Sequence, residues 1–182
     1  MTASIGFAGA QTPIDPEPPF AAPGEDAELG DPSVAAAAQL RAAVARIDPA
    51  AEFTANGAQF RVNQVPITLV YDLNADRMRL VAPVSALDDV EPEILVRLMQ
   101  ANFESALDAR YAIAQGVIWS TFIHPLSTLD SEEFGSGIGQ TVNLVTTFGG
   151  SYTSGAIIFG GGDNVTEERA LIDSLQEKTR DL

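Results

Sequence analysis

The sequence contains no cysteine and only one histidine, His124. The absence of cysteine excludes disulfides, thiolate metal sites, iron–sulfur clusters and a cysteine nucleophile. One histidine excludes a polyhistidine metal site within a single chain. We therefore expect this protein to use neither a metal ion nor an organic cofactor.

Positive charge is also scarce, because 10 Lys and Arg residues stand against 25 Asp and Glu residues, for a net charge of −15 over 182 residues. Nucleic acids and anionic membranes bind basic surfaces, so we expect neither as a partner. Long-range attraction instead favours a basic and apolar segment of another protein or peptide. No window approaches the roughly 18 consecutive apolar residues of a membrane span.

Residues 1–32 have the composition of a tail, with six acidic residues, no Lys or Arg, and six prolines. Proline removes a backbone donor and like charges repel, so we expect this tail to be disordered. The sequence leaves open whether the tail is a solvated extension or recruits a partner. We expect residues 33–150 to form one domain, and residues 151–182 a Gly-rich linker and a final helix.

The first ten residues do not resemble a secretory signal peptide. They contain no Lys or Arg, and Gly6 and Gly9 interrupt their short apolar run. A signal peptide has a positive start followed by a longer apolar stretch. We therefore expect a cytoplasmic protein.

Periodicity predicts an α+β domain. A helix starts at Asp31-Pro32 and runs to Ile47, and alternation of apolar and polar residues then predicts strands at 59–62, 65–72 and 77–82. A second helix starts at Pro92, and two further strands at 110–114 and 117–123 are joined by a tight turn at Gln115-Gly116. The short connections favour an antiparallel sheet.

The third predicted helix has a clear start. Asp130 and Glu133 match a capping box, and Leu129 and Phe134 match the hydrophobic staple across it. A last helix is predicted at 165–179. The expected fold is therefore an antiparallel five-stranded sheet flanked by helices, in the order α-βββ-α-ββ-α-α.

The strand at 117–123 is apolar on both faces, with Trp119 on one and Phe122 on the other. A helix covers one face of such a strand, so something else must cover the other. We expect a homodimer with Trp119 and Phe122 near the contact. Gly135 and Gly139 share a helix face that allows a close approach, either by the chain's own sheet or by a second subunit.

Catalytic motifs are weak. The glycines at 160–162 match neither a P-loop nor a dinucleotide-binding pattern. His124 lies near Ser120, Ser127 and Asp130 in the sequence, but no nucleophile-elbow pattern supports a hydrolytic triad. The acidic cluster at 88–93 lacks the spacing of a calcium loop, and helix capping explains it better. We expect a protein that is not an enzyme.

A family resemblance covers residues 35–148. Its motifs are Phe60-Arg61-Val62-Asn63, Ile67-Thr68-Leu69-Val70-Tyr71-Asp72, the run from Asp76 to Pro83, the helix from Pro92 to Phe103, Ala109-Arg110-Tyr111-Ala112-Ile113 and His124-Pro125-Leu126. In this pattern the chain resembles the class I type III secretion chaperone-like fold, in its YbjN-type branch. The resemblance carries no catalytic residues.

The resemblance implies a small acidic protein, often a homodimer, that binds extended polypeptide over apolar grooves without ATP. The leading functional interpretation is therefore a non-enzymatic binding module, chaperone-like or a regulatory adaptor. A self-associating assembly protein without a separate ligand is the first alternative, and a hydrolase using His124 is the less favoured one.

The expected peptide groove lies between the first helix and the first strands. The side chains expected to line it are Leu40, Val44, Val62, Leu69 and Val70, where an added strand would gain main-chain hydrogen bonds. The same residues could simply belong to the hydrophobic core, and this interpretation is the more favoured one. The sequence keeps both interpretations open.

Overall fold

The computed structural model describes residues 32–104, 106–148 and 165–180. The elements are α1 (Pro32–Ile47), β1 (Glu52–Thr54), β2 (Gly57–Val62), β3 (Val65–Asp72), β4 (Arg77–Ala86), the 3₁₀ turn η1 (Leu87–Asp89), α2 (Pro92–Glu104), β5 (Arg110–Ala114), β6 (Val117–His124), α3 (Ser131–Thr146) and α4 (Val165–Thr179). The acidic tail and the glycines at 160–162 lie outside the described residues.

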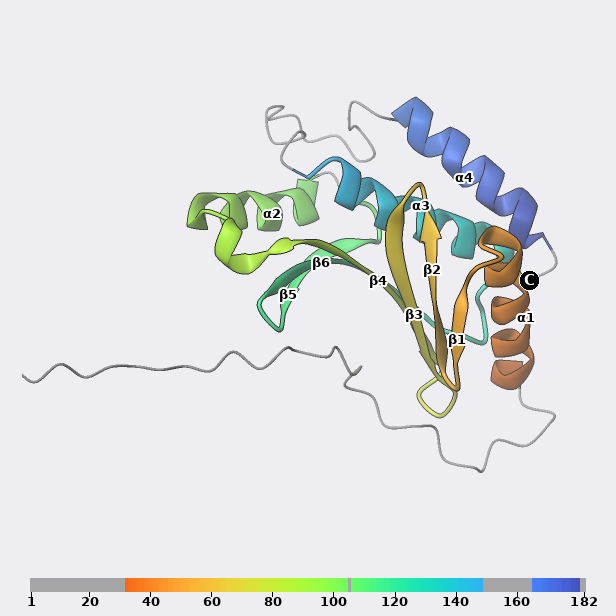
Figure 1. Ribbon diagram of the computed structural model, residues 1–182. Helices are drawn as coiled ribbons and strands as arrows, with labels where there is room; N and C mark the ends of the chain where they lie inside the picture. The colour runs from red at the N-terminus through yellow and green to blue at the C-terminus, as the bar shows by residue number, and fades with distance from the viewer. Residues whose placement is uncertain (1–31, 105, 149–164, 181–182) are drawn as a thin grey trace, which may run out of the picture.

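In the described part of the chain, six antiparallel strands form one sheet in the order β1-β2-β3-β4-β6-β5. The chain leaves β4, passes through α2 to the outer strand β5, and returns as β6 between β5 and β4. Figure 1 shows α1 and α3 on the same side of this curved sheet, with α4 as an outer layer beside them. The hydrophobic core lies between this sheet face and the helices.

Local sequence signals fix the turns and the start of α3. Asn63 and Gln64 between β2 and β3, and Gln115 and Gly116 between β5 and β6, have positive φ angles. Two-residue loops of this conformation match the twist of antiparallel strands. At α3, the Asp130 side chain accepts from the Glu133 backbone and the Glu133 side chain accepts from the Asp130 backbone, so the predicted capping box is confirmed.

The prediction of five strands is wrong, because β1 adds a sixth. Its three residues are all exposed, so they lack the apolar alternation that identifies a strand in a sequence. Tertiary contacts hold it in place: the Arg41 guanidinium donates to the Thr54 carbonyl at 2.6 Å and lies 4.8 Å from the centre of the Phe53 ring.

Strand β4 continues to Ala86, beyond the predicted end at Ala82. Its pairing with β3 stops at Val81, whereas its pairing with β6 continues after a register shift between Pro83 and Ser85. Pro83 therefore lies where β4 has a neighbour on one side only, and there a strand tolerates the missing proline N–H.

Candidate functional site

Helix α2 carries two apolar stripes, and only one of them faces the protein. On the inner stripe, Leu98 is buried and Ile94 and Leu95 are half-buried against the core. The outer residues are Val96, Met99 and Phe103, which are 59%, 51% and 77% exposed. Their spacing of three and four residues places them in one row, which we call the α2 stripe.

The docking of α2 explains why this row faces outward. The Asn102 side chain donates to the Tyr111 carbonyl at 3.0 Å and accepts from the Tyr111 backbone N–H at 2.7 Å. Asn102 thus pairs with the free edge of β5 as a neighbouring strand would, and it fixes the rotation of α2 about its axis. Because Phe103 follows Asn102 directly, its side chain is turned away from that contact.

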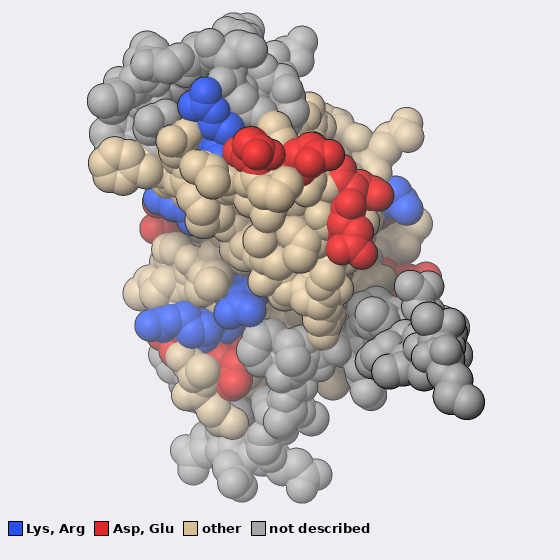
Figure 2. All heavy atoms as spheres, turned by 90° about the vertical axis from the view of Figure 1, so that its left-hand side faces the viewer, with Lys and Arg blue, Asp and Glu red and all other residues tan. Residues whose placement is uncertain are grey.

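The surface at this end of the molecule is largely uncharged. Figure 2 faces the end where α2 and the β5–β6 hairpin lie, and shows an area without charged side chains, with acidic side chains along its upper right border and basic side chains on its left. The start of α2 supplies exposed acidic residues, Glu91 and Glu93, after Asp88 and Asp89 of η1. Exposed apolar patches with a polar rim are typical of protein interaction sites.

The residues predicted to line a peptide groove lie mostly inside the domain. Leu40 and Val44 are 0% exposed, and Val62 and Leu69 are also buried. They belong to one core cluster between α1 and the sheet. Val70 is half-buried on the opposite sheet face. The structure therefore separates Val70 from the other four residues, and those four match the core interpretation that the sequence had kept open.

The residues predicted at a dimer contact are also separated. Trp119 is half-buried on the sheet face away from α3, whereas Phe122 is buried on the α3 side, where a Cβ at Gly137 would lie 2.6 Å from its ring. Cβ atoms at Gly135 and Gly139 would meet Gln176 and Ile172 of α4. Helix α4 of the same chain, not the sheet, makes the close approach that these glycines allow, and the dimer itself stays a prediction.

A cavity of about 870 Å³ opens between the end of β6, α3 and α4. Its lining includes the apolar side chains Phe122, Ile123 and Ile172, and acidic side chains from α3 and α4. His124 lies at its wall. Within residues 32–104, 106–148 and 165–180, no group of three or more His, Asp or Glu side chains is arranged to hold a metal ion.

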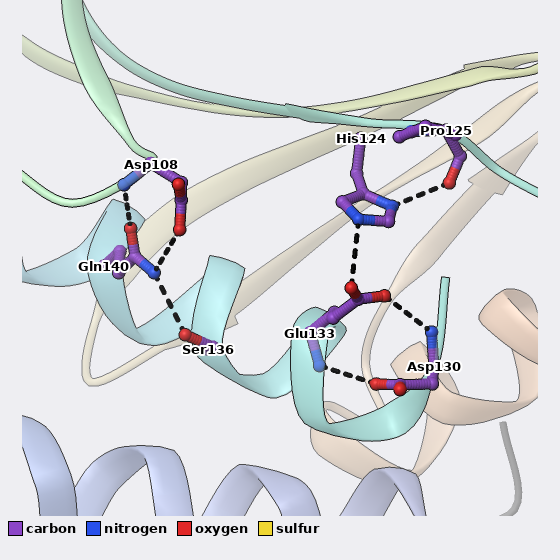
Figure 3. A network of polar contacts seen from close by, with 7 residues as sticks. All are labelled: Asp108, His124, Pro125, Asp130, Glu133, Ser136 and Gln140. Atoms are coloured by element: carbon purple, nitrogen blue, oxygen red, sulfur yellow. Dashed lines mark hydrogen bonds and ion pairs between the residues drawn. The ribbon is translucent and has the colours of Figure 1, made fainter. Parts of the chain in front are cut away.

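His124 takes part in a polar network that Figure 3 shows. Its Nδ1 lies 2.7 Å from the Pro125 carbonyl oxygen, and its Nε2 lies 3.3 Å from a Glu133 carboxylate oxygen. Because both partners are acceptors, both ring nitrogens donate only when the imidazole is protonated. Glu133 in turn accepts from the Asp130 backbone. The histidine therefore ties the end of β6 to the start of α3.

This arrangement does not assemble the hydrolytic triad considered above. The Ser127 hydroxyl donates to Asp76 at 2.7 Å. Ser120 is fully buried, and its hydroxyl has no hydrogen-bond partner among the described residues. Asp130 is engaged in the helix cap. In the described part of the chain, His124 contacts an acid and a carbonyl and no candidate nucleophile.

Asp76 anchors the segment that follows His124. Its carboxylate accepts from the Ser127 backbone N–H and hydroxyl, both at 2.7 Å. These hydrogen bonds hold the pKa of Asp76 below its ordinary value of 3.8. At the start of the sheet, hydrogen bonds from the backbones of Arg61 and Ala50 likewise lower the pKa of Asp48.

These lowered pKa values predict acid sensitivity. A carboxyl whose pKa is lower in the folded state stabilises the fold above its unfolded pKa, and this contribution is lost as the pH falls through the folded pKa. We expect the free energy of unfolding of Asp76→Asn to lie below that of the wild type at pH 7, and the gap to narrow once the pH falls below 3.8, the ordinary value.

Urea unfolding at a series of pH values tests this expectation. Asp89→Asn, which changes an exposed residue of η1, is the matched control. If the difference in the free energy of unfolding between wild type and Asp76→Asn stayed constant from pH 7 to below pH 3.8, the assignment of the lowered pKa to the Ser127 contacts would be contradicted.

Comparison with known proteins adds likenesses in fold only. No family model and no curated protein matches the chain. The ExsC–ExsE complex matches at 18% identity with a TM-score of 0.41, over 49% of this chain and 70% of that chain. The HopA1–SchA chaperone–effector complex matches at 10% identity with a TM-score of 0.43, over 51% of this chain and 74% of that chain.

The helices and the antiparallel sheet of the described residues define an α+β protein. The YbjN-type branch stays a prediction. Among the residues that the structure describes, no helix is both long and apolar enough to cross a membrane.

Proposed function

We propose that this protein is a non-enzymatic, chaperone-like binding module that holds an extended apolar and basic segment of another protein on the α2 stripe. The observation that carries the proposal is the exposure of Val96, Met99 and Phe103 in one row. Leaving large apolar side chains in water is unfavourable, and a partner that covers them recovers that free energy.

The charges beside the stripe favour a basic partner. The exposed acidic residues of η1 and the start of α2 border the uncharged surface, and the chain as a whole carries a net charge of −15. Carboxylates at the rim steer a basic segment toward the surface, while the apolar row supplies the contact area. A cytoplasmic location and the YbjN-type branch belong to the same proposal.

The test uses a fluorescein-labelled peptide of alternating Leu and Lys residues, with binding followed by anisotropy. We expect Met99→Ser combined with Phe103→Ser to weaken binding by at least about tenfold, because burying one large apolar side chain is worth about 1.5–3 kcal/mol. The same double variant should also lose ATP-independent suppression of aggregation of a chemically unfolded reference protein.

Two controls sharpen the test. Ala45→Ser changes an exposed residue of α1 and should bind as the wild type does. Circular dichroism should show the double variant to be folded, since both changed side chains are exposed. Equal affinity of wild type and double variant would remove the α2 stripe from consideration.

Self-association is the second candidate, because the same stripe suits a second copy of the chain. Sedimentation at tens of micromolar separates the two functions, since an assembly with a weak Kd still shows itself at about that concentration. A dimer that dissociates in the double variant, with no peptide binding by the wild type, would favour assembly. A monomer that binds the peptide would favour the binding module and refute the predicted homodimer.

A further inference from the structure

The chain's only sulfur atoms belong to methionine, because it contains three methionines and no cysteine. Met1 lies outside the described residues, and the other two have opposite surroundings. Met78 is 1% exposed on β4, where it belongs to the core, whereas Met99 is 51% exposed on α2. Oxidation of a methionine follows the exposure of its sulfur, so an oxidant that meets the folded domain reaches Met99 before Met78.

The docking of α2 keeps the Met99 side chain outward. Leu98, the preceding residue, is 1% exposed and belongs to the core cluster. Successive side chains of a helix are about 100° apart around its axis, so the next one leaves that contact. The hydrogen bonds between Asn102 and Tyr111 hold α2 in this rotation. Exposure of the Met99 thioether therefore follows from the way the helix is anchored to β5.

The residues one helical turn away from Met99 are uncharged. They are Leu95 and Val96 on the N-terminal side, and Asn102 and Phe103 on the C-terminal side. Met99 is the middle residue of the α2 stripe, and a thioether suits such a surface because it is apolar and polarisable. A group that adds a strong dipole at this position changes the surface on which we propose that the partner binds.

Oxidation by a hydroperoxide adds such a dipole in one step. The lone pair of the Met99 sulfur attacks the terminal peroxide oxygen, an S–O bond forms, and the O–O bond breaks. The sulfur loses two electrons, and the departing oxygen takes the proton of the attacked oxygen and leaves as water or an alcohol. Hydrogen peroxide is uncharged, so the net charge of −15 does not repel it. The product, methionine sulfoxide, is a polar side chain.

We propose that Met99 is an oxidation site that controls the α2 stripe: the thioether form binds the partner, and the sulfoxide form releases it. This inference rests on the function proposed for the stripe and adds a reversible chemical switch to it. Burial of the sulfoxide against an apolar side chain of the partner removes water from its oxygen without supplying a donor, which opposes binding. Methionine sulfoxide reductases regenerate the thioether, so the oxidised protein can regain its partner.

Peroxide treatment followed by digestion and mass spectrometry tests the site itself. Cleavage before each Asp places the three methionines in separate peptides, residues 1–14, 76–87 and 89–107. In the folded wild type, the peptide with Met99 should gain one oxygen at least about tenfold faster than the peptide with Met78, because Met78 reacts only when the core opens. In concentrated urea the two rates should become similar.

Anisotropy of the labelled Leu–Lys peptide tests the switch. We expect oxidation of the wild type to weaken binding by about fivefold or more, since a buried polar group without a partner is unfavourable. A methionine sulfoxide reductase supplied with a thiol reductant should restore the affinity.

Two variants assign the effect to one sulfur. Met99→Leu is compared with itself before and after peroxide, and its affinity should not change on treatment. Met78→Leu is a volume-conserving change in the core and keeps Met99, so its affinity should fall on oxidation as that of the wild type does.

Oxidation of Met99 as slow as that of Met78 would overturn the proposal at the site. Equal affinity of untreated and oxidised wild type, with Met99 fully converted, would overturn the switch and leave the α2 stripe as a binding surface. Loss of affinity in peroxide-treated Met99→Leu would assign the effect to another residue. An untreated wild type that does not bind the peptide would refute the proposed function and the switch with it, while the same digest would still decide whether Met99 is the oxidation site.

Discussion

Val44→Asp is expected to unfold the domain, whereas Val70→Asp should remain folded. Val44 is 0% exposed in the last turn of α1, among core residues of the sheet. An unpaired buried charge costs about 3–5 kcal/mol, against a total stability of about 5–15 kcal/mol for a domain. Val70 lies half-buried on the sheet face opposite α1 and α3, where an aspartate keeps contact with water.

Comparing Val44→Asp with Val70→Asp tests whether each of these predicted peptide-binding residues belongs to the core or to an open surface. Ala45→Asp adds the same charge one position along α1 at an exposed site, and should leave the melting temperature within a few degrees of the wild type. Circular dichroism during heating measures all three variants. A Val44→Asp protein that unfolds cooperatively near the wild-type temperature would restore an open groove between α1 and the sheet.

Gly57→Ala is expected to destabilise the protein by about 1–3 kcal/mol or more, the range found when a packed interior is overfilled. A Cβ at Gly57 would collide with the Leu69 carbonyl oxygen and lie 3.3 Å from the Cα of Val70. The obstacle is the backbone of β3, paired with Gly57 in the sheet, so it cannot move away as a side chain can.

Gly116→Ala is the matched comparison, because no atom lies within 4 Å of a Cβ there. Gly116 has a φ of +71°, a conformation that strains any residue with a Cβ. Alanine there should therefore lower the free energy of unfolding by about 1 kcal/mol. Asparagine tolerates this conformation, so Gly116→Asn should recover most of the loss, whereas Gly57→Asn should not. Equal urea midpoints for Gly57→Ala and wild type would contradict the close approach of β2 to β3.

The sequence by itself determined most of the local structure. The capping box at Asp130 and Glu133, the turn at Gln115-Gly116 and the start of α2 at Pro92 were all predicted correctly. Each depends on residues within a few positions of one another, so the sequence contains the whole interaction. The core residues of α1 and the sheet follow from the same short-range periodicity.

Only the tertiary structure decided what lies against each face. The Asn102–Tyr111 contact orients α2, so that its apolar residues lie in one row against the core and one exposed row. Strand β1 is held by Arg41, which binds the Thr54 carbonyl and lies over the Phe53 ring. The local pattern of apolar and polar residues does not contain these contacts. On the sheet face opposite α1 and α3, Val70 of β3 lies beside Arg79 of β4 and Arg79 beside Ile123 of β6. These neighbours depend on strand register, and register follows from long-range pairing.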